Sequence, residues 1–265
     1  GEKTRPTLET VQAHLAALVG ADSDTPLGDA AGLYWDYRDL APTGAAGDQL
    51  ASAIAGRLAD AGLYARAAEL LTYQMDKRAT DIAKGPLSVR IAELHIRDNR
   101  PDKALEVIRR SEGPAYPEVM LTDRRRATAI ALFRMGKRAE ALALADLLAD
   151  SAPLRSEMLW QARDWTGFAA ANRLALPAGR AIGAKGEAVV LRQAIAHAMT
   201  GDEAALAVLR RRYLSAFKGS KTRPAFDMLT GAPDRIDAAA LDAAIAAAPL
   251  ADTDSDRTAL LIDQG

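Results

Sequence analysis

The feature of this sequence that most constrains its fold is a turn that recurs at a nearly constant spacing. Helix-ending residues stand between two alanine-rich segments five times, and the successive spacings are 37, 37, 28 and 37 residues. Glycine and asparagine tolerate the left-handed backbone conformation that ends an α-helix, and aspartate is the next most suitable residue. A period of this size is typical of a solenoid of helical hairpins. The predicted turn residues are Gly62, Asn99, Gly136, Asp164 and Gly201.

Residue size around these turns repeats as well. Small residues that stand seven before and five after a turn predict that the two helices of a hairpin cross closely. The residues seven before are Ala55, Ala92, Ala129, Glu157 and Ala194, and those five after are Ala67, Ala104, Ala141, Ala169 and Leu206. Larger residues stand four before, namely Leu58, His95, Leu132, Trp160 and His197. Glu157 departs from the rule, and the 28-residue step predicts a fourth hairpin whose first helix is about two turns shorter.

Composition agrees with an all-α fold. Alanine, the strongest helix former, makes up about a fifth of the 265 residues, and aromatic residues make up only 5%. No segment shows the period-2 alternation of a β-strand. We therefore predict a right-handed helical-hairpin solenoid with an N-terminal helical cap (1–46), a hairpin array (47–217) and a C-terminal helical cap (218–265). The predicted helices are 7–20, 47–61, 64–78, 86–98, 101–111, 117–135, 137–150, 154–162, 165–175, 185–200, 202–217 and 237–248, with shorter turns near 29–36, 223–230 and 256–262.

Two segments resemble tetratricopeptide repeats. They are Ala92, His95, Asn99, Ala104 and Ile108 in one hairpin, and Ala129, Leu132, Gly136 and Ala141 in the next. The order of the segments 32–42, 58–63, 67–71 and 159–165 is similar to the C-terminal part of large envelope tetratricopeptide proteins of alphaproteobacteria. That resemblance implies a periplasmic or envelope-associated protein with a role in cell-envelope integrity. Some members of that group are labelled endoglucanases, and no residue pattern in this sequence supports such an activity.

The resemblance also predicts a partner-binding groove, because the first helix of each tetratricopeptide hairpin lines the inner surface. A protein or peptide partner would contact a mixed apolar and charged surface there. The carboxylate clamp of the family requires Lys, Asn and Arg at positions where Val89 and Glu93 stand, so that form of binding is not expected. The predicted partner-binding residues are Glu93, Ile96, Arg126, Ile130 and Phe133, with Ser52, Gly56 and Val89 beside them.

A run of basic residues is a second candidate site. Between Val208 and Arg223 there are six basic residues and no acidic one, whereas 234–257 holds six acidic and two basic residues. The run is compatible with solvated helix faces, with a patch for an anionic partner or lipid headgroups, or with a surface that the acidic tail covers. The predicted basic patch is Arg210, Arg211, Arg212 and Lys218, with Lys221 and Arg223 in the same run.

Residues for catalysis or metal binding do not converge anywhere in the sequence. There is no cysteine, and His14, His95 and His197 are the only histidines, without a local catalytic partner. The segment 179–186 lacks the lysine spacing and the Ser or Thr of a phosphate loop. We therefore expect no catalytic residue, no metal and no cofactor. The 34 basic and 35 acidic residues nearly cancel, which argues against binding of nucleic acid.

These observations favour a non-enzymatic protein–protein interaction scaffold in the cell envelope. Two alternatives stay open, namely a helical flank of a larger envelope enzyme that processes murein or polysaccharide, and a cytosolic peptide-binding regulator. No apolar run approaches the roughly 20 residues of a membrane span. The chain begins with Gly1, and we expect it to be a piece of a longer protein that could bring it near a membrane.

Overall fold

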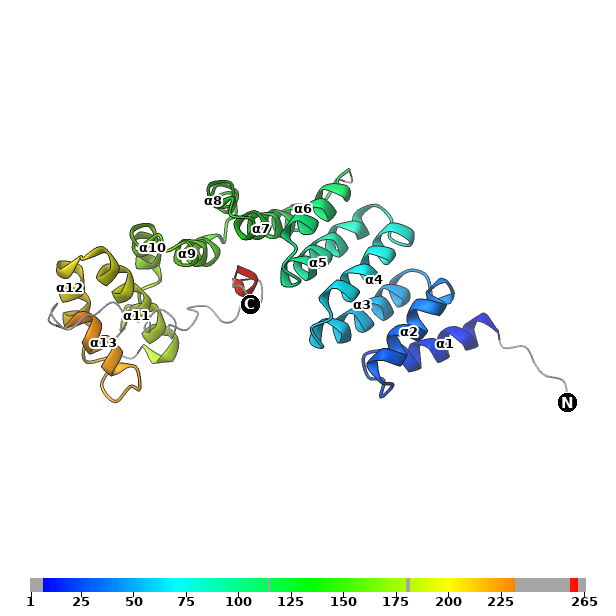
Figure 1. Cartoon of the computed structure of the whole chain (residues 1–265), viewed down its shortest axis with the longest axis horizontal. Helices are drawn as coiled ribbons and strands as arrows, with labels where there is room; N and C mark the ends of the chain where they lie inside the picture. The colour runs from blue at the N-terminus through cyan, green and yellow to red at the C-terminus, as the bar shows by residue number, and fades with distance from the viewer. Residues whose placement is uncertain (1–6, 114, 180–181, 232–257, 262–265) are drawn as a thin grey trace. The chain divides into compact units, whose positions relative to one another are not determined.

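The fold is all-α, as predicted. The computed structural model describes residues 7–113, 115–179, 182–231 and 258–261, and within these ranges the regular elements are α-helices and short 3-10 helices without any strand. Thirteen α-helices lie in this part of the chain (Figure 1). The chain divides into two compact units between Leu144 and Ala145. The sequence predicts no domain boundary at this point, because the predicted hairpin array (47–217) continues through it.

In the first unit, the helices from α1 to α7 pack mainly on their neighbours in the sequence. α5 also packs on α7, the first helix of the following hairpin, and this stacking of successive hairpins is typical of an α-solenoid. The elements are α1 (Leu8–Val19), α2 (Leu27–Tyr37), η1 (Arg38–Leu40), α3 (Ala45–Asp60), α4 (Tyr64–Lys77), η2 (Asp81–Ala83), α5 (Lys84–Arg97), α6 (Pro101–Arg110), α7 (Glu118–Arg134) and α8 (Arg138–Ala145), which ends at the boundary.

In the second unit, α11 is the central helix, because it packs on α10, α12 and α13. α9 packs on α10 and on the 3-10 helix η5. The elements are α9 (Ala152–Gln161), α10 (Trp165–Asn172), η3 (Arg173–Ala175), α11 (Gly183–Thr200), α12 (Glu203–Tyr213), α13 (Arg223–Thr230) and η5 (Thr258–Leu261).

The predicted helices agree with these bounds to within a few residues, with three exceptions. The segments expected as short turns near 29–36 and 223–230 are the α-helices α2 and α13, and the helix expected over 137–150 ends at Ala145. The predicted helix 237–248 lies outside the described residues.

All five hairpin turns share one backbone hydrogen-bond pattern. The residue after the left-handed position donates its N–H to a carbonyl five residues earlier, as in a Schellman motif. Four predicted turn residues have the expected positive φ, with 74° at Gly62, 54° at Asn99, 80° at Gly136 and 68° at Gly201. The five bonds run from Leu63 to Leu58, Arg100 to His95, Lys137 to Leu132, Asp164 to Leu159 and Asp202 to His197, at 2.8–3.0 Å.

The fourth turn corrects the prediction. Arg163, with φ 55°, takes the left-handed conformation there, and Asp164 begins the next helix instead. The Asp164 carboxylate accepts a hydrogen bond from the backbone N–H of Gly167 at 2.9 Å, which caps α10. Asp164 was predicted at this turn because aspartate tolerates the left-handed region better than arginine. In the structure Asp164 is the N-cap of α10, so the left-handed residue is the one before it, Arg163.

This shift by one residue also changes which side chains are equivalent in the repeat. The position five after the turn is the fully buried Phe168 in place of Ala169, whereas Ala67, Ala104 and Ala141 are fully buried at that position in the other hairpins. Seven before the turn stands Ser156 in place of Glu157, so the fourth hairpin keeps a small residue at this position but not at the position five after the turn. Four before it stands the buried Leu159 in place of Trp160.

Candidate functional site

The structure places the five predicted groove residues in different environments. Glu93, Arg126 and Phe133 are half-buried. Ile96 and Ile130 are each only 1% exposed, so they belong to the core and offer no surface to a partner, contrary to our prediction. The physical reason is that α5 packs on α4, α6 and α7, which buries more of its circumference than a groove-lining helix would expose.

Ser52 and Gly56, two further predicted groove residues on α3, lie beneath Arg90, which was not among the predicted residues. Arg90 on α5 donates a hydrogen bond from Nη2 to the Ser52 carbonyl at 3.1 Å. The same nitrogen lies 3.7 Å from where a Cβ on Gly56 would stand. Val89, the third of these positions, is buried. The surface that α3 was expected to present is therefore partly covered by Arg90.

The predicted basic patch is used in part for internal packing of the second unit. Arg210 on α12 forms an ion pair with Asp227 on α13 at 2.9 Å and a hydrogen bond to Thr230 at 3.2 Å. Arg223 reaches the other oxygen of Asp227 at 3.1 Å. Desolvation raises the pKa of the Asp227 carboxyl, but the hydrogen bonds from Arg223 and Arg210 outweigh it and lower the pKa.

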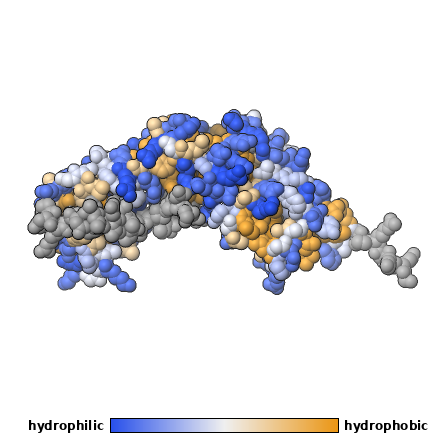
Figure 2. Space-filling view, in the orientation of Figure 1, coloured by the Kyte–Doolittle hydropathy of each residue, from blue (hydrophilic) through white to orange (hydrophobic). Residues whose placement is uncertain are grey.

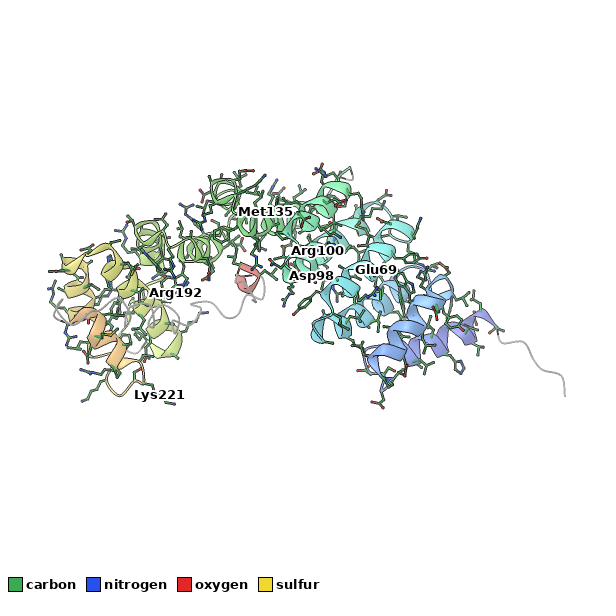
Figure 3. All side chains as sticks on the ribbon, viewed as in Figure 1. Glu69, Asp98, Arg100, Met135, Arg192 and Lys221 are labelled. Carbon is green, nitrogen blue, oxygen red and sulfur yellow. The ribbon has the colours of Figure 1, made fainter. Side chains whose placement is uncertain are left out.

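The remaining members of the basic run are more accessible. The guanidinium of Arg212 donates to the Pro177 carbonyl at 3.3 Å and lies 5.1 Å from the ring centroid of Tyr213. Arg211 and Lys218 are exposed, and so is Lys221, which Figure 3 labels. The basic patch therefore narrows to Arg211, Arg212, Lys218 and Lys221 on the surface.

An apolar pocket of about 370 Å³ lies between α2, α3 and α4 in the first unit. It presents two large apolar side chains to solvent, since Trp35 is 38% exposed and Leu63 is 47% exposed. On the face shown in Figure 2, hydrophobic residues gather over these N-terminal helices. The pocket is lined by Leu27, Gly28, Ala31, Trp35, Leu58, Leu63, Arg66, Glu69 and Leu70.

Trp35 is held in place at this pocket. The Arg38 guanidinium lies 4.5 Å from the Trp35 ring and 4.8 Å from the Tyr73 ring, so it is stacked between two aromatic side chains. Tyr73 donates a hydrogen bond to the Asp39 carboxylate, and this bond raises the pKa of the Tyr73 hydroxyl. An aromatic ring that is fixed and partly exposed loses little conformational entropy when it contacts a partner.

A larger pocket of about 550 Å³ in the second unit has a buried ion pair in its wall. Glu157 on α9 and Arg192 on α11 lie 2.8 Å apart, and each side chain is only 3% exposed. Arg192, labelled in Figure 3, lies 4.2 Å from the Trp160 ring and 5.3 Å from the Phe168 ring. Burial lowers the pKa of Arg192, whereas Glu157 opposes this effect. In the register predicted from the sequence, Glu157 departed from the small-residue rule, and this departure was the sequence signal for the ion pair.

A chain of polar side chains continues along α10 and α11. Asn172 donates to Gln193 at 2.9 Å, and Gln193 Nε2 lies 2.9 Å from His197 Nε2. Because Gln193 Nε2 can only donate, the His197 ring accepts at Nε2 and carries its proton on Nδ1, which faces Asp202 at 3.4 Å. Burial lowers the pKa of His197, although Asp202 raises it. The sequence analysis missed Asn172 and Gln193, although Gln193 stands one helical turn before His197.

Neither pocket carries a metal-binding arrangement. Among the described residues, no group of three or more His, Cys, Asp or Glu side chains is placed to hold a metal ion. None of the described helices is both long enough and apolar enough to span a membrane.

No protein-family model, curated protein or solved structure matches this chain. The resemblance to tetratricopeptide repeats therefore rests on the residues at the turns and on the spacing of those turns.

Proposed function

We propose that this chain is a non-enzymatic interaction scaffold of the tetratricopeptide type, a right-handed solenoid that binds a peptide or helix of a protein partner. The repeated left-handed turns and the buried alanines around them support the family assignment. The resemblance to envelope proteins supports a periplasmic or envelope-associated location and a role in envelope integrity.

The observation that carries the binding role is the apolar pocket between α2, α3 and α4. A partly exposed tryptophan beside exposed leucine, at the edge of a cavity of about 370 Å³, matches the aromatic anchors that dominate binding energy at protein interfaces. The Arg66–Glu69 ion pair, at 3.0 Å, lies in the wall of the same pocket. A partner would place an apolar side chain in the pocket and use these charges to set its orientation.

Two glycines of α2 provide a matched test. Gly28 and Gly32 are both exposed, and a Cβ added at either meets no atom within 4 Å, so a glutamate side chain can start from either position without a backbone clash. Gly28 lines the apolar pocket, whereas Gly32 does not. Partners are captured from an envelope extract by cross-linking and identified by mass spectrometry, and the affinity of each identified partner is then measured. We expect Gly28→Glu to weaken binding at least tenfold and Gly32→Glu to leave it unchanged.

The predicted groove and the basic patch are the rival sites. If a partner binds the Gly28→Glu variant as tightly as the wild type, the proposed pocket is wrong. Loss of binding on Arg126→Glu would then place the partner on the predicted groove. Loss on Arg211→Glu, together with strong salt dependence, would place it on the basic patch.

A further inference from the structure

A second pocket of the first unit, of about 400 Å³, differs from the apolar pocket in its chemistry. It lies between α4, α5 and α6, and we refer to it as the charged pocket. Figure 3 labels Glu69 on α4 and Arg100 at the start of α6, which both contribute to its wall. The side chains that concern the argument are Glu69, Thr72, His95, Arg100, Lys103 and Glu106.

His95 in this pocket has an unsatisfied ring nitrogen. Its Nδ1 atom is buried and has no hydrogen-bond partner in the described part of the chain. A buried polar atom without a partner costs free energy and calls for an explanation.

The second unit contains the same histidine position with its partner present. His197 stands four residues before the left-handed residue of its turn, as His95 does, and its Nδ1 faces the Asp202 carboxylate at 3.4 Å. Asp202 is the residue directly after that turn. The residue directly after the other turn is Arg100, so a cation stands where the second unit has a carboxylate.

The backbone places these two pairs alike. The N–H of Arg100 donates to the carbonyl of His95 at 2.8 Å, and that of Asp202 donates to His197 at 2.9 Å. The two hairpins therefore hold a histidine and the following turn residue in the same backbone relationship. What the His95 hairpin lacks is the negative charge that Asp202 supplies.

Two cations of the charged pocket are available for such a charge. The side chains of Arg100 and Lys103 form no ion pair or hydrogen bond with any other described residue. The other charges are partly committed, since Glu69 pairs with Arg66 at 3.0 Å and Arg110 pairs with Asp76 at 3.2 Å. Arg100 and Lys103 line the same pocket as His95, and both lower the pKa of its ring.

We infer that the charged pocket binds a carboxylate of the peptide partner, held between Arg100 and Lys103 beside the ring of His95. This inference rests on the proposed function and names the chemistry of the partner, an acidic side chain. The aspartate in the equivalent hairpin shows that this position accommodates a carboxylate. A phosphate dianion fits less well, because Glu69 and Glu106 also line the pocket.

The two pockets of the first unit adjoin, since Glu69 lines both of them. They are formed largely by α2, α4 and α6, the second helices of the hairpins, whereas the predicted groove lies on the first helices. A peptide that follows these second helices would place an apolar residue in the apolar pocket and an acidic residue in the charged pocket.

The test uses a probe with a single carboxylate, N-acetyl-glutamate α-amide, and its uncharged counterpart N-acetyl-glutamine α-amide. The ring signals of His95 are followed by NMR during titration of the whole chain. We expect saturable shifts with the glutamate probe and none with the glutamine probe. The charged groups around His95 come from three helices and their ends. They are Asp98 directly after α5, Arg100 directly before α6, Asp102, Lys103, Glu106 and Arg110 of α6, and Glu69 of α4. An added anion in their midst raises the pKa of His95.

Three variants make the test specific. Arg100→Gln combined with Lys103→Gln should weaken probe binding at least tenfold. Lys137→Gln is the matched control, because Lys137 occupies the same turn position in the next hairpin, where Leu132 stands in place of the histidine. Arg100→Asp supplies a carboxylate from within the chain, so it should raise the pKa of His95 without the probe and abolish probe binding.

The inference is overturned if the His95 signals do not respond saturably, if the double variant binds the probe as well as the wild type does, or if inorganic phosphate competes more strongly than the glutamate probe. The outcome is independent of the apolar pocket, because Gly28→Glu should leave probe binding unchanged. Loss of partner binding in Gly28→Glu without any response of His95 would therefore reject the carboxylate site alone.

Discussion

Among the described residues, each of the two units buries one arginine, and the two side chains are paired in different ways. In the first unit, Arg124 on α7 donates to the hydroxyls of Ser88 and Ser111, both at 2.7 Å, and to the Ile108 carbonyl at 2.8 Å. Its guanidinium lies 4.7 Å from the ring of Tyr116. All of these partners are neutral groups.

In the second unit, Arg192 is paired with the Glu157 carboxylate at 2.8 Å and stacked against Trp160 and Phe168. Its Nε atom is buried and has no hydrogen-bond partner among the described residues. The difference lies in what remains if the arginine is removed. Ser88 and Ser111 also donate to the Gly85 and Ile108 carbonyls, so they stay hydrogen-bonded. Glu157 would stay behind as a buried charge, with only Gln161 as a donor in the described part of the chain.

The largest predicted effect follows from this difference. We expect Arg192→Met to lower the free energy of unfolding by about 3–5 kcal/mol, because breaking a buried ion pair leaves an uncompensated charge. Arg124→Met should cost about 1–3 kcal/mol, since it removes hydrogen bonds and packing but leaves no charge. Urea unfolding of both variants measures the comparison.

The double variant Arg192→Met with Glu157→Leu is the control. It removes both charges, so most of the loss should be recovered. If Arg192→Met and Arg124→Met lower the free energy of unfolding equally, the buried Glu157 carboxylate does not make the second unit different from the first.

The next effect concerns the position of the small residues around each turn. The three turns of the first unit stand where the sequence predicts them, whereas the first turn of the second unit is one residue earlier than predicted. We expect Ala104→Leu and Ala141→Leu each to cost about 1–3 kcal/mol, because both alanines are fully buried and added volume strains a close helix contact. Ala169→Leu should cost less, since Phe168 and not Ala169 occupies the equivalent position. Thermal unfolding of the three variants tests this, and an Ala169→Leu cost as large as the other two would restore the register predicted from the sequence.

This contrast also shows how far the sequence could predict the structure. The helices and four of the five turn residues followed from glycine, asparagine and alanine, whose effects are local. The fourth turn did not, because Asp164 could serve either as a turn residue or as an N-cap, and only the chain geometry decides between them. The groove residues Ile96 and Ile130 were misplaced because one helix contacts several others, a property of packing that periodicity does not contain. The two pockets of the first unit bring together residues of three helices each, so no local motif could indicate them.

Charge changes beside the two repeat-equivalent histidines should shift the pH dependence of stability in opposite directions. Burial lowers the pKa of both His95 and His197 below the ordinary value of 6.5. The folded chain therefore binds fewer protons than the unfolded chain, so stability is complete above pH 6.5 and falls as the pH drops toward the lowered pKa values. Asp202 raises the pKa of His197, so Asp202→Asn should lower it and enlarge this loss, whereas Arg100→Asp should reduce the loss at His95.

Asparagine is a good N-cap, so Asp202→Asn keeps the start of α12 intact. We expect the two variants to differ from the wild type by less than about 1.4 kcal/mol, the free energy of one pKa unit. Urea unfolding at pH 7 and pH 5, with NMR titration of both rings, measures the effect. A change of the same sign in both variants would contradict the proposed electrostatic difference between the two hairpins.

The smallest predicted effect concerns the turns themselves. Glycine or asparagine takes the left-handed position in four hairpins, whereas Arg163 takes it in the fourth, with φ 55°. A left-handed conformation costs an L-residue with a side chain about 1–2 kcal/mol, and glycine avoids that cost but loses about 0.5–1 kcal/mol through its greater freedom in the unfolded chain. Arg163→Gly should therefore stabilise the chain by about 0.5–1 kcal/mol, and Gly136→Ala should destabilise it by a similar amount, about 0.5–1 kcal/mol. Arg163→Ala is the control, because it removes the exposed side chain and keeps the strain, so it should give no gain. If Arg163→Ala stabilises the chain as much as Arg163→Gly, the side chain and not the backbone conformation sets the cost of this turn.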